Sequence, residues 1–264
     1  MKIQACNLVM YPKMFAFKSN VNTNVKQNVF KDKLPNPRLY ADVSDFNCPW
    51  QKREQLQQEY RSKLIDACFD KNKRLNTKLV DYLDTTKFDF ETKDGTVKKM
   101  TVSEMLENIV SNKRPYKGSL YHATGTTEIG QKIIKEGFDP FKISRAKIGP
   151  GFYFTSSEGH ALEYSRAVLK CDYEGTCAYV EPEFYTKLKT GNVLGGICNF
   201  VGFDTSGYPL GMDSYDAAGK ILDEYVRDCF VNKMGIDMAE GYSSWNEHSI
   251  VIFNLDKISN LRFK

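Results

Sequence analysis

The 264-residue sequence predicts an α+β protein with helices concentrated in its first part and strands in its last part. Apolar residues recur at four-residue steps between residues 56 and 83, a spacing typical of amphipathic helices. Beyond residue 116, short runs rich in β-branched and aromatic residues alternate unevenly with helical stretches. Strands separated by long, irregular connections favour an α+β arrangement over a doubly wound parallel sheet.

The composition is that of an ordinary globular protein, with 41 % hydrophobic and 27 % charged residues. The sequence has no run of 18 apolar residues, so no membrane span is expected. Its seven cysteines lack regular spacing and any C-x-x-C pair, and it has only three histidines. We therefore expect free thiols in a reducing compartment such as the cytoplasm, and no metal site.

The net charge of +4 is unevenly distributed along the chain. Residues 1–115 hold 21 Lys and Arg against 14 Asp and Glu, a balance of +7, whereas the remainder holds 16 against 19, a balance of −3. A basic first part favours nucleic acid or an acidic partner. The alternative is a set of solvated helix faces.

The first 115 residues are interpreted as a basic, mostly helical N-terminal extension. Residues 1–48 are rich in Asn, Lys and Pro, and we expect them to be weakly structured or draped over a larger body. Two amphipathic helices are predicted from apolar residues four positions apart, namely Leu56, Tyr60 and Leu64, and then Leu75, Leu79 and Leu83. The charged residues of the first helix would then lie on the exterior.

The rest of the extension predicts a hairpin and a third helix. Residues 88–90 alternate in polarity, and Asp94-Gly95 is a strong hairpin turn. Thr101 and Glu104 form a capping box for the helix that follows. Because Arg114-Pro115 would end this helix, we place the domain boundary after residue 115.

Residues 116–264 are expected to form a second domain. Its predicted elements are a strand ending at His122, a helix through Ile129 and Ile134 that Gly137 ends, strands at 152–154 and 176–180, a helix at 221–230, and strands at 248–253 and 261–263. The glycine-rich stretch 191–213 lacks the spacing of a dinucleotide fingerprint or a phosphate loop. We interpret that stretch as surface loop and edge strand.

Four short motifs follow one another in this second domain. They are Leu120-Tyr121-His122-Ala123-Thr124, Gly149-Pro150-Gly151-Phe152-Tyr153-Phe154, Tyr164, and Asn246-Glu247-His248. The set His122, Tyr153 and Glu247 resembles the H-Y-E signature of the poly(ADP-ribose) polymerase-like (PARP-like) branch of the ADP-ribosyltransferases. The gaps, 31 residues from His122 to Tyr153 and 94 from Tyr153 to Glu247, are of the size that the family shows.

This resemblance covers roughly residues 116–264 and implies both a fold and a reaction. The fold would be ADP-ribosyltransferase-like, with two packed, mainly antiparallel sheets and flanking helices. The enzyme would use NAD as its co-substrate, without a metal, and would transfer ADP-ribose to an acceptor with release of nicotinamide. Transfer of single ADP-ribose units is expected rather than polymer formation.

The resemblance also implies roles for individual residues. His122 would hold the adenine-side ribose, and the backbone of Ala123 and Thr124 would hold the nicotinamide amide. Tyr153 and Tyr164 would pack against opposite sides of the nicotinamide ring.

Four further positions complete the implied NAD site. Glu247 would bind the ribose 2′-hydroxyl and orient the attacking group, next to the positive charge that develops on the ribose. Gly151 belongs to the strand that carries the first tyrosine, and the loop around Arg145 would cover NAD. Ala161 takes the position of a serine that hydrogen-bonds the nicotinamide amide in the family.

Two departures from the family pattern motivate alternatives. Ala123 replaces a glycine, and Ala161 forgoes a hydrogen bond worth on the order of 1 kcal/mol. A module that binds NAD or ADP-ribose without turnover is therefore a second hypothesis. A third is a related transferase acting on RNA, such as a tRNA 2′-phosphotransferase-like activity, which the basic first part motivates. That family's second histidine in place of Tyr153 argues against it.

The expected partner is an acceptor macromolecule, in the first place a protein. Nucleic acid is the alternative, through the basic residues of the extension. The family includes host-cell regulators as well as bacterial toxins and effectors, and the sequence does not choose between them.

Overall fold

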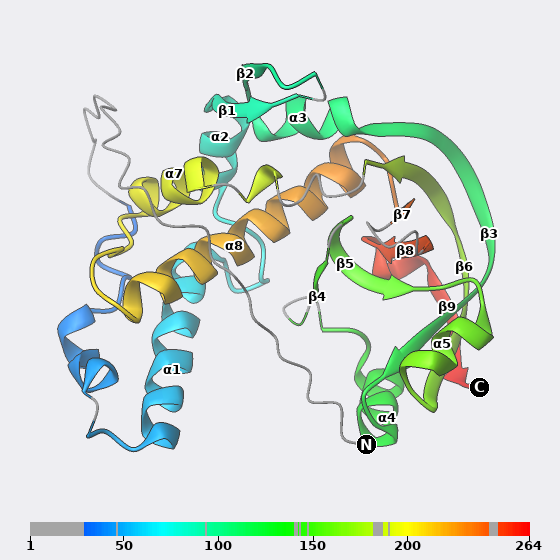
Figure 1. Ribbon diagram of the computed structural model, residues 1–264, viewed down its shortest axis with the longest axis horizontal. Coiled ribbons are helices and arrows are strands. Elements are labelled where there is room, and N and C mark those ends of the chain that lie inside the picture. Colours follow the sequence, from blue (N-terminus) through cyan, green and yellow to red (C-terminus); the bar gives the residue numbers. More distant parts are fainter. Residues whose placement is uncertain are drawn as a thin grey trace.

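A computed structural model describes residues 29–45, 47–92, 94–139, 142, 144–146, 148–181, 187–189, 191–242 and 248–264, and for residues 144–146 and 191 it describes the backbone alone. The protein is α+β, as predicted, with one large mixed sheet and one small antiparallel sheet. Figure 1 shows most helices gathered beside the large sheet, with the long helix α8 (Leu210–Asp228) running from the helical side toward the strands.

The elements before residue 110 are helices and one hairpin, as the sequence predicted. They are η1 (Pro37–Ser44), α1 (Trp50–Cys68), α2 (Thr77–Thr85), β1 (Phe88–Glu91), β2 (Val97–Met100) and α3 (Val102–Ile109). The capping box is present, because the Thr101 side chain accepts from the Glu104 N–H and the Glu104 carboxylate accepts from the Thr101 N–H. Gly95, at φ +79°, closes the hairpin in a conformation that glycine adopts readily.

The described part of the first 48 residues is anchored to the helices. Phe30, Tyr40 and Val43 are each less than 4 % exposed and belong to the main hydrophobic core. The Tyr40 ring packs against Tyr60 of α1, with ring centroids 5.1 Å apart. This segment is therefore draped over a larger body, as expected, while residues 1–28 lie outside the described part of the chain.

One charged residue of α1 does not simply face solvent. Arg61 donates to the carboxylate of Asp213 on α8 at 2.6 Å, and Asp213 is only 1 % exposed. Gln57, one turn earlier, donates to the same carboxylate at 3.3 Å. The expectation of an entirely exterior charged face is thus wrong at Arg61, because a buried carboxylate requires a positive partner.

The remaining elements build the large sheet and the helices around it. They are β3 (Val110–Thr124), α4 (Thr127–Glu136), β4 (Ser144–Ala146), β5 (Gly149–Phe154), α5 (Glu158–Tyr164), β6 (Ala167–Val180), α7 (Gly191–Val201), α8, η3 (Cys229–Lys233), β7 (Met238–Tyr242), β8 (His248–Ile252), η4 (Leu255–Lys257) and β9 (Ile258–Phe263). The strands and helices predicted outside the glycine-rich stretch 191–213 are present, and Gly137 ends α4 at φ +82°.

The large sheet has the strand order β3-β6-β7-β8-β5-β4, and β9 pairs with the first half of β6. All of these pairings are antiparallel except that of β6 with β7. The sheet also curls back on itself, because Tyr121 of β3 and Thr155, just after β5, exchange backbone hydrogen bonds of 2.8 and 2.9 Å. β3 and β5 therefore meet although they are far apart in the strand order (Figure 1).

The strand β3 runs without interruption through the expected boundary at residue 115. Arg114 pairs with Cys177, and Pro115 pairs with Thr176. Proline is tolerated here because β3 stands at the edge of the strand order along this stretch, so no second neighbour needs its missing N–H. The preceding helix ends earlier than expected, at Ile109.

Residues 202–209 of the glycine-rich stretch form a loop, as expected, but its first part is helical rather than an edge strand. This first part forms α7, whose Val193, Ile197 and Cys198 are fully buried in the main core. Gly196 packs so closely that a Cβ atom there would lie 2.8 Å from the Phe88 ring and 2.9 Å from the Tyr82 hydroxyl. The prediction was wrong for residues 191–201 because this glycine allows close packing of a helix and does not form a turn.

Two hydrophobic clusters lie on opposite faces of the large sheet. The main cluster joins residues from the helices of the first 115 positions to α7, α8 and one sheet face, for example Leu64, Leu106 and Leu222. The second cluster lies on the other face and includes Leu120, Phe154 and Ile250. The two predicted domains thus share one core.

Candidate functional site

His122 stands where β3 meets β5. Its Nδ1 lies 2.7 Å from the backbone carbonyl oxygen of Tyr153. Because a carbonyl oxygen only accepts, the hydrogen must be on Nδ1. In the neutral imidazole, Nε2 then carries a lone pair and can accept a hydrogen bond from a hydroxyl group.

Three phenylalanine rings surround the His122 imidazole. The ring centroid of Phe154 lies 5.1 Å away, that of Phe138 5.4 Å and that of Phe152 6.5 Å. Burial among these rings lowers the pKa of His122, because desolvation disfavours the charged form. The imidazole is therefore neutral at neutral pH and suits a hydroxyl donor better than an anion.

Tyr153 contributes its backbone to His122, but its side chain lies on the opposite face of β5. Neighbouring residues of a strand point to opposite faces. Phe152 and Phe154 belong to the cluster beside His122, whereas Tyr153 packs against the main core. The Tyr153 hydroxyl accepts from the N–H of Ile148 at 3.1 Å and donates to the carbonyl of Gly149 at 3.2 Å.

The Tyr153 ring thus packs against the main core and its hydroxyl bonds the backbone, and burial raises the pKa of this phenol. The structure brings the His122 imidazole and the Tyr153 backbone together, and it does not bring the two side chains together. The predicted stacking of this ring on nicotinamide stays a prediction.

The last residue of β3 and the first residues of β5 each pack closely against other parts of the chain. The Thr124 hydroxyl lies 2.8 Å from the carbonyl oxygen of Thr126 and 3.0 Å from that of Ala167, and it is buried. Ala123 lies between His122 and Thr124 and is half-buried. A Cβ atom at Gly151 would lie 2.4 Å from the carbonyl oxygen of Ile252, so only glycine fits beside β8.

The predicted residues of α5 have very different surroundings. Ala161 is 1 % exposed, whereas Tyr164 is 64 % exposed and its ring lies 5.4 Å from that of His160. α5 packs against β3 and β6. The backbone of Arg145 in β4 pairs with Pro150, and its side chain lies outside the described structure.

Glu247 lies outside the described residues. In the sequence it directly precedes His248, the first residue of β8, and β8 pairs with β5. Its predicted role is therefore untested by the geometry.

A cluster that the sequence did not single out joins β3, β7 and β8. The Glu240 carboxylate accepts from Arg114 Nη1 at 2.6 Å and lies 3.3 Å from His248 Nε2. The Arg114 hydrogen bond is the main cause that lowers the pKa of Glu240, so this carboxylate stays ionised at neutral pH. The sequence signal was weak, because the three residues share no local motif.

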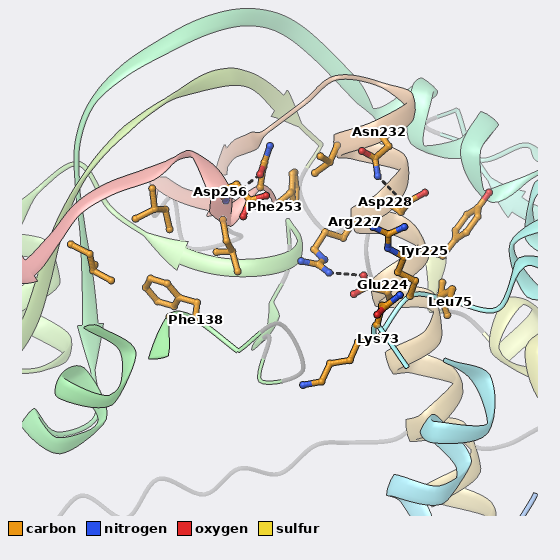
Figure 2. Close-up of a pocket in the computed structure, with 18 of the residues that line it drawn as sticks. Lys73, Leu75, Phe138, Glu224, Tyr225, Arg227, Asp228, Asn232, Phe253 and Asp256 are labelled. Atoms are coloured by element: carbon orange, nitrogen blue, oxygen red, sulfur yellow. Dashed lines mark hydrogen bonds and ion pairs between the residues drawn. The ribbon is translucent and has the colours of Figure 1, made fainter. Parts of the chain in front are cut away.

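A groove of about 1150 Å³ lies beside the His122 region. Its walls come from the α1–α2 loop, α8 with η3, and the segment from Phe253 to Leu261, and Figure 2 shows Phe138 set apart from the α8 side chains across it. Lys73 and Arg74 line one wall, and the paired Arg227 and Glu224 lie on α8 with Nη2 and Oε1 2.5 Å apart. Phe138 belongs both to this groove and to the rings around His122.

Among the described residues, no group of three or more His, Cys, Asp and Glu side chains is arranged to hold a metal ion. The six described cysteines are free and buried. Within the same residues, no helix combines the length and the apolar character that crossing a membrane requires.

Comparison with known proteins finds no match to this chain among family models, curated proteins or solved structures. The candidate site therefore rests on its own residues and geometry.

Proposed function

We propose that the protein transfers ADP-ribose from NAD to an acceptor, with release of nicotinamide. One relationship carries the proposal: the His122 imidazole is hydrogen-bonded to the backbone of Tyr153, and β8, which follows Glu247 in the sequence, pairs with that same strand β5. His122 and Tyr153 thus belong to the strands β3 and β5, which meet, and Glu247 directly precedes β8, which pairs with β5.

His122 is suited to bind a ribose hydroxyl. Its Nδ1–H is fixed by the Tyr153 carbonyl, and its neutral state leaves Nε2 as an acceptor. The phenylalanine rings around it form an apolar wall that would exclude water from the sugar. We assign to Tyr153 the orientation of this imidazole, because its own ring is packed in the main core.

Glu247 supplies the carboxylate in this proposal. Breaking the bond between C1′ of the ribose and the nicotinamide nitrogen places positive charge on the ribose ring. A carboxylate near that charge lowers the barrier, as in glycoside hydrolysis. No metal is needed for this step, since nicotinamide leaves as a neutral molecule.

The proposal extends to the fold and the acceptor. The long strand β6 pairs with β9 along its first half and with β7 along its second, which supports two mainly antiparallel sheets that share this strand. We propose a protein acceptor that receives single ADP-ribose units in a reducing compartment.

The test uses NAD labelled in the nicotinamide ring and, separately, in the adenylate. The expected result is release of labelled nicotinamide together with transfer of the adenylate label to an acceptor in a cell lysate. Glu247→Gln should keep NAD affinity within a few-fold and slow transfer by orders of magnitude, because the side chain keeps its shape and loses its charge. Absence of nicotinamide release from the wild-type protein would refute the proposal.

A module that binds NAD without turnover remains the second candidate, and Ala161 favours it. This residue is buried and carries a methyl group where the family places a hydroxyl. Calorimetry distinguishes the two candidates: heat of NAD binding, with intact NAD recovered afterwards, would select the binding module over the transferase.

A further inference from the structure

In the cluster of Arg114, Glu240 and His248, a carboxylate holds an imidazole, which is how many catalytic bases are arranged. Glu240 bridges the other two residues, with distances of 2.6 Å to Arg114 Nη1 and 3.3 Å to His248 Nε2. Because the Glu240 carboxylate is ionised, it only accepts, and the His248 hydrogen must be on Nε2. When the ring is neutral, its lone pair is on Nδ1, and this atom forms no hydrogen bond within the described residues.

The cluster lies on the same face of the large sheet as His122. Ile250 and Ile252 belong to the second hydrophobic cluster, and His248 shares their face because strand residues two apart point the same way. Ile250 pairs with Phe154, whose ring is 5.1 Å from that of His122. His248 is two residues beyond Ile250, about 7 Å further along β8.

The side chain of His248 is accessible to another molecule. It is 35 % exposed, and the neighbouring Tyr242, with its ring centroid 5.3 Å away, is 49 % exposed. Glu240, in contrast, is only 20 % exposed and held by Arg114. An accessible imidazole, oriented by a half-buried carboxylate that is itself anchored, is the arrangement that general-base catalysis requires.

We infer that His248 is the general base that activates the acceptor, and that Glu240 is the positioning residue that fixes its tautomer. The inference rests on the proposed transferase function. In the step, the bond between C1′ and the nicotinamide nitrogen breaks, and the acceptor heteroatom forms its bond to C1′. The proton of the acceptor passes to Nδ1 of His248, and neutral nicotinamide leaves.

The other two histidines do not fit this role. Nδ1 of His122 donates to the Tyr153 carbonyl, its Nε2 is assigned to a ribose hydroxyl in the proposed function, and no carboxylate contact to its ring occurs within the described residues. Nδ1 of His160 lies 3.4 Å from the Thr155 hydroxyl, and no carboxylate contact to its ring occurs within the described residues.

The first experiment compares His248→Ala with the control His160→Ala. We expect His248→Ala to lower kcat for transfer about 100-fold, a typical contribution of a general base, while KM for NAD changes little. Added imidazole should restore part of the lost rate, because the replaced side chain is accessible. Loss of NAD affinity instead of kcat, absence of rescue by imidazole, or an equal loss in His160→Ala would overturn the inference.

The second experiment does not depend on activity. Nitrogen-15 chemical shifts of the histidine rings report which nitrogen carries the hydrogen. We expect a single His248 tautomer with the hydrogen on Nε2 in the wild-type protein, and mixed tautomers in Glu240→Gln, whose amide can donate or accept. A wild-type hydrogen on Nδ1, or no change in the variant, would overturn the dyad.

The two experiments together separate two kinds of failure. Wild-type protein that releases no nicotinamide, yet shows the expected tautomer, refutes the transferase function and with it the role of base, while the dyad stands. Wild-type protein that transfers ADP-ribose with the wrong tautomer refutes the dyad alone.

Discussion

Nδ1 of His122 and the backbone carbonyl oxygen of Tyr153 are 2.7 Å apart, across the contact that closes the curled sheet. Burial lowers the pKa of His122 and so favours the neutral imidazole, and the hydrogen bond to Tyr153, which raises the pKa, offsets this effect only in part. In the unfolded chain the same residue titrates near its ordinary value of 6.5. Folding stability is therefore linked to pH at this position.

The sign of the linkage follows from the lowered pKa. The unfolded chain takes up the proton first, so the contribution is favourable above pH 6.5 and is lost as the pH falls below it. We expect His122→Phe to reduce the loss of stability between pH 7.5 and pH 5.5, because phenylalanine does not titrate. Urea unfolding of both proteins at the two pH values checks this. An identical loss in both would show that the imidazole titrates normally in the folded protein.

Replacing Tyr153 by phenylalanine should destabilise the protein by about 1–3 kcal/mol. The variant leaves the buried N–H of Ile148 without its acceptor. The matched control is Tyr164→Phe on the exposed side of α5, which should change the stability by less than about 0.5 kcal/mol. Thermal and urea unfolding measure both.

The role of the Tyr153 ring can be tested in the same series. If the ring serves the core alone, folded Tyr153→Leu keeps the NAD affinity of the wild-type protein. A folded Tyr153→Leu variant that loses tenfold or more of its NAD affinity would establish stacking on nicotinamide instead.

Arg61 should be far more important for stability than its neighbour Lys63. Arg61→Met leaves the buried Asp213 carboxylate with Gln57 as its one side-chain hydrogen-bond donor among the described residues, at a cost of about 3 kcal/mol or more. Lys63→Met breaks an exposed pair with Glu59 and should change the stability far less, because water and salt screen exposed charges. Urea unfolding distinguishes the two, and equal losses would contradict a buried pair between α1 and α8.

Two adjacent glycines of α7 should respond in opposite directions to alanine. Gly195 has open space around its Cβ position, so Gly195→Ala should stabilise the helix by about 0.5–1 kcal/mol. Gly196→Ala brings a methyl group within 3 Å of Phe88 and Tyr82 and should destabilise the protein by about 1–3 kcal/mol. Thermal unfolding of the pair checks both signs, and a stabilising Gly196→Ala would argue against the close contact.

The sequence predicted the elements whose signals are local. The capping box of Thr101 and Glu104, the turn at Gly95 and the end of α4 at Gly137 depend on backbone groups a few residues apart, and all are present. Pro115 was misleading, because its effect depends on whether a strand has one neighbour or two, and that is set by residues far along the chain.

In the candidate site, too, the sequence predicted local relationships and did not predict those between distant residues. The order of the motifs places His122 and Tyr153 on strands that do meet, as the hydrogen bond between them demonstrates. Alternation along residues 152–154 predicts that the Tyr153 side chain lies on the face of β5 opposite to those of Phe152 and Phe154. It does not predict on which of these two faces His122 lies. The Arg114–Glu240–His248 cluster could not be found locally, since its members come together only when β6 pairs with β3 and β7, and β8 pairs with β7.

The position of β6 has a consequence for how the chain folds. This central strand pairs with β3, which precedes it, and with β7 and β9, which come more than 50 residues later. Local helices can form early, whereas the sheet closes only through contacts between distant parts of the sequence. Such high contact order slows folding, so we expect the helices to form well before the sheet and its site are complete.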